Sequence, residues 1–371
     1  MDIYTYIREY GKYTFKEKEF NDVDALIFSY LSYGNYEKVL DKTSKLTIQE
    51  VGRKHIKEYK GRDKNIISVK EGNKILRYIM DVDRYKDCLV YNYDYIGNHD
   101  VQFGVMSIEY EKNKVFVSYE GTDEMFSGWL ENLMLSCKFP TISHKLAIKY
   151  LNKHYTFSTK ELIVGGHSKG GNLALVASMY ANLLVRCKIK KIYNLDGPNL
   201  LEKEFKSKKY QKVLNKYVHI IPKCSMIGLM LYHSNDYVID VVDVGILSHA
   251  INYWLVEEDH FIKSKLTPLS KQFDKGFIEW CEKYSKEEKE EFIDNLTDIL
   301  DKANIKTLLE LKDARIFKLI HESKDMNDKT KEILLGFLNL IIDSFKITKK
   351  EALKEFMSSI FNSKKETKEE N

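Results

Sequence analysis

The residues best suited to chemistry lie in one short stretch, Gly166-His167-Ser168-Lys169-Gly170, which follows the apolar run Leu162-Ile163-Val164. A helix-compatible run of small and apolar residues comes next. A strand that turns sharply into a helix exposes the hydroxyl at the turn, and the helix N-terminus favours the negative charge that forms when a hydroxyl attacks a carbonyl. The stretch therefore predicts Ser168 as a nucleophile; the alternative is a tight turn without chemistry.

A nucleophilic serine needs a base, which is a histidine in most such sites. The histidines downstream of Ser168 are His219, His233, His249, His260 and His321. We expect His249 to be the base because it follows the strand pattern at 237–242, and the histidine of such sites comes after a late strand. His233 is the rival. His219 lies within a strand pattern, and His260 borders acidic residues.

The base in turn needs an acid to orient it. Asp196 ends the strand pattern at 189–195 and precedes Gly197-Pro198, so it should lie at the same edge of the sheet as Ser168. Asp236, Asp240 and Asp243 are the alternatives, and Asp196 could also be a turn-forming residue only.

The oxyanion of an acyl intermediate needs two N–H donors, one of them on the residue after the nucleophile. That residue is Lys169. The second donor is predicted at Thr122, which follows the strand pattern at 114–119 and Gly121. The segment 128–133 could cover the site as a lid; the alternative is an ordinary packing helix.

The elements that must position these residues alternate along the chain before residue 262. The predicted strands are 101–109, 114–119, 162–164, 189–195, 218–221 and 237–242, and the predicted helices are 22–33, 129–137, 144–155 and 172–184. Such alternation predicts an α/β fold with a mostly parallel sheet and helices on both faces.

The last part of the chain, 263–371, is highly charged, contains Pro268 as its only proline, and repeats apolar residues at helical spacing. Ser285-x-x-Glu288 and Thr348-x-x-Glu351 are typical of capping boxes that begin helices. We therefore predict two parts, 1–262 as the α/β part and 263–371 as an amphipathic helical extension. The alternative role of the extension is contact with a protein partner or a membrane surface.

The composition of the chain argues against several other classes of protein. The 371 residues are 43% hydrophobic and 31% charged with a net charge of +4, which argues against a nucleic-acid-coating protein. The five cysteines are widely spaced, which argues against a zinc ribbon or a disulfide scaffold and fits a reducing compartment. The start of the chain has no signal-peptide pattern, and no apolar run is long enough to cross a membrane. The expected localisation is cytoplasmic.

These motifs resemble those of the class 3 triacylglycerol lipases within the α/β-hydrolases and, more closely, those of the bacterial Mbeg1-like proteins. The matching segments are Asn21-Asp22-Val23-Asp24-Ala25-Leu26, Leu31-Ser32-Tyr33, Gly121-Thr122, Trp129-Leu130-x-Asn132-Leu133, GGHSKGGNLA at 165–174, Tyr193-Asn194-Leu195-Asp196-Gly197-Pro198, and Pro222 with Ser225-Met226-Ile227-Gly228. The resemblance covers about residues 20–262. It implies an α/β-hydrolase fold with Ser168 as nucleophile, His249 as base, and Thr122 and Lys169 around the oxyanion.

The chain also departs from the lipase pattern. Glu120 stands where these lipases often have arginine before Gly-Thr, and Lys169 replaces an apolar residue. Their usual acid falls in a region where this chain has Lys223-Cys224-Ser225, so a displaced acid is expected. Asp196 resembles the pancreatic-type arrangement, in which the acid follows the earlier strand. The family has no established substrate.

The resulting expectation is a serine hydrolase that cleaves carboxylic esters, with a lipid or other acyl ester as substrate and no metal or organic cofactor. The same residues could also cleave thioesters or peptides. The alternative is a protein that is not an enzyme: a catalytically degenerate hydrolase fold that binds or regulates a partner through its helical tail.

Overall fold

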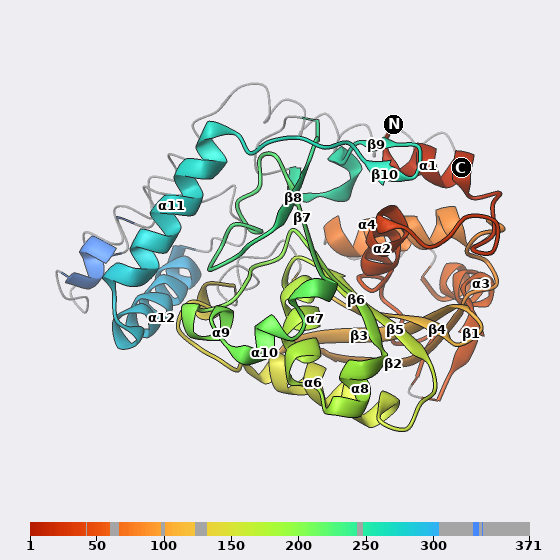
Figure 1. The fold of residues 1–371 in the computed structure, drawn as a ribbon, viewed down its shortest axis with the longest axis horizontal. Helices are drawn as coiled ribbons and strands as arrows, with labels where there is room; N and C mark the ends of the chain where they lie inside the picture. Colours follow the sequence, from red (N-terminus) through yellow and green to blue (C-terminus); the bar gives the residue numbers. More distant parts are fainter. Residues whose placement is uncertain are drawn as a thin grey trace.

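The computed structural model describes residues 1–41, 43–59, 67–97, 101–122, 132–242, 248–303, 329–333 and 336. They form one eight-stranded sheet, in which the strands follow one another in sequence order, and a small ribbon of two strands (Figure 1). The strands of the sheet are β1 (Lys45–Thr47), β2 (Leu89–Gly97), β3 (Gln102–Glu111), β4 (Lys114–Tyr119), β5 (Glu161–His167), β6 (Ile189–Leu195), β7 (Tyr217–Pro222) and β8 (Asp236–Ile239). Strands β1 to β4 pair antiparallel, and β4 to β8 pair parallel.

Helices cover both faces of this sheet (Figure 1). One face packs against α1 (Ile3–Tyr10), α2 (Asp22–Leu31), α3 (Ile48–Tyr59) and α4 (Ile67–Ile79). The other face packs against α6 (Ile142–Tyr155), α7 (Lys169–Tyr180), α8 (Leu183–Lys188) and the short α9 (Glu202–Phe205), α10 (Lys208–Gln211) and η1 (Leu214–Lys216). Strand β5 shows why two faces are needed: Ile163 joins the first core, whereas Leu162 and Val164 join the second.

Two further helices, α11 (Pro268–Lys283) and α12 (Lys286–Ala303), follow η3 (Ile251–Tyr253) and the ribbon of β9 (Val256–Glu257) and β10 (His260–Phe261). The predicted capping box begins α12: Glu288 N–H donates to Ser285 Oγ, and Ser285 N–H donates to the Glu288 carboxylate. Phe273 and Phe277 of α11 share a core with Met230 from the loop after β7. The division of the chain at residue 262 stays a prediction. The Thr348 box lies outside the described residues.

The predicted α/β class with helices on both faces and a C-terminal helical extension is confirmed. β4 and β6 have the predicted bounds, whereas β5 is longer and α7 begins at Lys169 rather than at Asn172. Ser168 lies at the turn from the central strand β5 into α7, which is the α/β-hydrolase arrangement. Among the described helices, none has the length and apolarity needed to cross a bilayer.

Candidate active site

Ser168 occupies the turn between β5 and α7. Its backbone has φ 56° and ψ −133°, a conformation that side chains rarely adopt and that costs about 1–3 kcal/mol. The flanking glycines make the turn possible, because a Cβ on Gly166 would overlap the backbone of Gly170, and a Cβ on Gly170 would overlap the carbonyl of Tyr119. The Ser168 N–H donates to the Leu195 carbonyl at 2.9 Å. The turn is therefore built against the end of β6.

Asp196 follows β6 at the same edge of the sheet. His167 and Leu195 are paired in the parallel register of β5 and β6, so the next residue of each strand, Ser168 and Asp196, leaves the sheet side by side. The Asp196 carboxylate is buried, and its Oδ1 accepts hydrogen bonds from Ser225 Oγ at 2.5 Å and from Gly228 N–H at 3.1 Å. One oxygen is thus held by the loop after β7, which leaves the other free to orient a base.

His249 is that base candidate. Its Nδ1 lies 2.6 Å from Asp196 Oδ2. The carboxylate takes the Nδ1–H, which leaves Nε2 as the nitrogen that can accept a proton. The imidazole is 27% exposed while Asp196 is 1% exposed, so the pair has a buried acid and an accessible base. Trp254 Nε1 donates to the Ser248 carbonyl at 3.0 Å and fixes the chain next to His249.

Two residues whose roles the sequence did not predict tie this base to the nucleophile strand. His167 Nε2 lies 2.9 Å from the His249 carbonyl oxygen, and the Tyr33 hydroxyl lies 3.0 Å from His167 Nδ1. Burial, and after it the neighbouring His249, lower the pKa of His167 well below its ordinary value. A neutral His167 that donates from Nε2 and accepts at Nδ1 satisfies both contacts.

The predicted oxyanion donors also lie at this edge. Thr122 follows β4, and Gly121 lies so close to the turn that a Cβ on it would come within 2.5 Å of the His167 carbonyl oxygen. The Lys169 backbone begins α7. The Lys169 side chain is buried, and its Nζ donates to the Gln102 carbonyl at 2.8 Å, so its charge is directed to the start of β3. Of the lid candidate 128–133, the part up to residue 131 lies outside the described residues.

The alternative acids and bases lie elsewhere. Asp236 accepts from Nδ1 of His219 and from Nδ1 of His233, each at 2.6 Å, and His233 Nε2 bonds Asp274 of α11 at 3.1 Å. Asp236 and His233 therefore belong to a separate cluster between β7, β8 and α11. The remaining alternatives are Asp240, paired with Lys223 at 2.8 Å, exposed His260 beside Asp259, and Asp243 and His321, which lie outside the described residues.

A family model described as Mbeg1-like matches residues 79–298. The chain belongs to the Mbeg1-like family. The match to the Mbeg1-like model begins later than the resemblance in the sequence and extends into α12, so it includes the first helices of the C-terminal extension. Ser168, Asp196 and His249 all fall within it.

Among solved structures, the chain is similar to one described as M37 lipase, with 15% identity over 55% of this chain and 67% of that chain and a TM-score of 0.33. This likeness is too small to establish a common fold, and the α/β-hydrolase arrangement follows from the sheet and the turn of this chain itself. No curated protein matches the chain.

The residues that support the candidate site are only partly recognisable in the sequence. Tyr33 and Ser225 lie in segments that resemble the family, but their contacts join positions 134 and 29 residues apart in the chain. No spacing rule links such positions. Only the folded sheet brings them to the same edge.

Proposed function

We propose that this chain is a serine hydrolase that cleaves carboxylic esters, with a lipid or other acyl ester as the substrate. The observation that carries the proposal is the pairing of His249 Nδ1 with buried Asp196 at 2.6 Å, on the strand end next to the strained Ser168 turn. A nucleophile, a base and an orienting acid at one edge of a sheet are the parts that acyl transfer requires.

The proposed reaction has two halves. Ser168 Oγ attacks the ester carbonyl while His249 Nε2 takes its proton, and the Asp196 carboxylate stabilises the imidazolium that forms. The N–H groups of Lys169 and Thr122 donate to the oxyanion, and His249 returns the proton to the leaving alcohol. Water then attacks the acyl-serine by the same route and releases the acid. The side chains required for this route are all in the chain itself.

Active-site labelling with a fluorophosphonate tests the proposal. Wild type should label and should hydrolyse p-nitrophenyl esters, and a panel of acyl chain lengths would then define the substrate. Ser168→Ala should abolish labelling and lower turnover by roughly 10⁶-fold, the size of the effect for a triad serine. Ser178→Ala is the matched control, because this serine is buried in the same helix and bonds only the Ala174 carbonyl among the described residues.

The result decides between two functions. Labelling that survives in folded Ser168→Ala would contradict the proposal. A folded wild type that neither labels nor hydrolyses any ester would favour the degenerate hydrolase fold that acts as a binding or regulatory module. We also propose a cytoplasmic location, which the five free cysteines support because thiols persist in a reducing compartment.

A further inference from the structure

The basic residues of this chain are distributed unevenly. Residues 132–195 contain ten lysines and arginines and a single acidic residue, Glu161, although the whole chain has 59 basic and 55 acidic residues. Glu161 is itself paired with Lys190 at 3.2 Å. This segment, which includes α6 and α8, is therefore strongly positive within a nearly neutral protein, and it favours a negatively charged partner.

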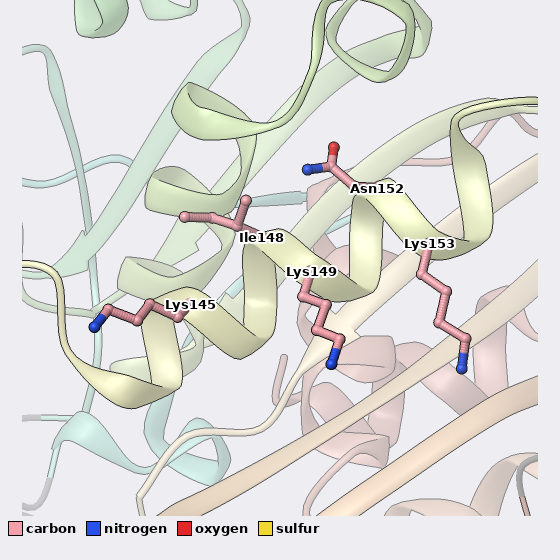
Figure 2. A pocket seen from close by; sticks show the side chains of 5 residues that line it. All are labelled: Lys145, Ile148, Lys149, Asn152 and Lys153. Atoms are coloured by element: carbon pink, nitrogen blue, oxygen red, sulfur yellow. The ribbon is translucent and has the colours of Figure 1, made fainter.

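The outer side of α6 carries three of these charges in one row. Lys145, Lys149 and Lys153 are exposed and four residues apart, which places them on the same side of the helix. None of the three has an ion-pair partner in the part of the chain that the structure describes. Together with Ile148 and Asn152 they line a shallow depression of about 580 Å³ (Figure 2).

Large apolar side chains stand at the end of this row. Phe157 is 93% exposed, and Leu183 and Leu184 at the start of α8 are 64% and 54% exposed. Asn182 joins the two segments, because its N–H donates to Asn152 Oδ1 at 2.9 Å and its side-chain amide donates to Thr156 Oγ1 at 2.7 Å. The segments that carry Phe157 and the two leucines are thus joined at this end of α6.

We propose that this surface, defined by Lys145, Lys149, Lys153, Phe157, Leu183 and Leu184, binds an anionic lipid bilayer. Lysines beside protruding aromatic and leucine side chains match the surface of a bilayer. Headgroup phosphates attract the ammonium groups, and the acyl region just below them accepts the apolar side chains. Phe157 projects almost completely from the protein. A fluid apolar phase can surround such a side chain without a preformed pocket.

The proposal is independent of the proposed function. Phe157 precedes the amino end of β5 and Leu183 precedes the amino end of β6, whereas Ser168 and Asp196 follow the carboxyl ends of the same strands. The apolar end of the lipid surface and the candidate active site therefore lie at opposite edges of the sheet, and the row of lysines runs along α6 from one edge towards the other. The activity of a lipid-surface variant on a soluble ester should be that of wild type.

Flotation of the full chain with vesicles tests the proposal. The chain should bind vesicles that contain phosphatidylcholine and phosphatidylserine, bind far less to phosphatidylcholine alone, and be released by added salt. Lys145→Gln/Lys149→Gln/Lys153→Gln should lower the partition coefficient on the order of 100-fold. Phe157→Ser/Leu183→Ser/Leu184→Ser should lower it at least about tenfold. Thermal unfolding confirms that each variant is folded.

A matched triple, Lys271→Gln/Lys275→Gln/Lys286→Gln, removes the same charge from exposed lysines of α11 and α12. It should bind nearly as wild type does. Equal losses in the two lysine triples would overturn the proposal, because binding would then follow net charge alone. The proposal would also be overturned if the lysine triple failed to bind while the serine triple bound fully, because the apolar side chains would then contribute nothing to binding.

Discussion

His167 and His249 lie ring against ring, with centroids 4.3 Å apart, and His167 Nε2 faces the His249 carbonyl oxygen at 2.9 Å. His167 is the last residue of β5 and precedes Ser168, so His249, the proposed base, is attached to the same strand end that presents Ser168. In the chain, His249 comes ten residues after the end of β8, so this contact ties the proposed base directly to the sheet.

His167→Phe should lower kcat by about 10–100-fold with little change in KM, because it keeps the packing but loses the donor to the His249 carbonyl, and a small displacement of the base slows proton transfer. His167→Gln offers an amide donor at a similar reach and should recover most of the rate. Steady-state kinetics on a soluble ester separate kcat from KM. An equal loss in both variants would show that His167 acts only through packing.

Asp196→Asn should lower kcat on the order of 10⁴-fold, because an amide cannot stabilise the imidazolium and favours the wrong tautomer of His249. Asp236→Asn is the comparison, since this residue is bonded to His219 and His233 instead. It should keep kcat within a few-fold while it lowers stability. Rate measurements on both variants identify the acid, and a larger rate loss for Asp236→Asn would contradict the assignment of Asp196.

Arg84→Met should lower the free energy of unfolding by roughly 3–5 kcal/mol, because it leaves the buried Asp24 carboxylate without its ion-pair partner at 2.6 Å. Arg84 also donates to the carbonyls of Lys18 and Glu19, so it joins α2 to the chain before it. Asp24→Leu combined with Arg84→Met should recover part of the loss. Urea unfolding of wild type, Arg84→Met, Asp24→Leu and the double variant checks this, and losses that simply add in the double variant would show that the two residues do not interact.

The sequence predicted the parts of the fold that local patterns determine. β4 and β6 are rich in β-branched and aromatic residues and are followed by Gly121 and by Gly197-Pro198, and both strands have the predicted bounds. The start of α7 was predicted three residues late, because Gly170 and Gly171 have low helix propensity and only tertiary packing holds them in the helix. The structure also contains β1, β2, α1, α3 and α4, which the sequence did not predict.

For the site, motif and chain order alone were enough to propose Ser168, Asp196 and His249. It could not identify what holds them, because those contacts join distant segments. Ser225 shows this well. It lies in the segment where the resemblance to class 3 lipases led us to look for the acid, and its hydroxyl donates to Asp196 after β6. Such a contact follows from the packing of the two loops and leaves no local pattern.

His233 lies between Asp236 of β8 and Asp274 of α11 and bonds both carboxylates. Burial lowers the pKa of His233, but hydrogen bonds to Asp236 and Asp274 outweigh this and raise it to about 9. For Asp236, burial raises the pKa, and the bonds from His219 and His233 outweigh that effect and lower it. A charged His233 between two carboxylates therefore links the loop after β7, strand β8 and helix α11.

The raised pKa of His233 determines how the stability of the protein changes with pH. The stabilisation by His233 is complete below its unfolded pKa near 6.5 and is lost as the pH rises through about 9, while the part due to Asp236 is lost in acid. Wild type should therefore lose about 2.5 kcal/mol of this stabilisation between pH 7 and pH 10. His233→Gln should already lack it at pH 7 and change less with pH. Hydrogen exchange of the α11 amides measures this, and an equal pH dependence in both proteins would contradict the assigned role of His233.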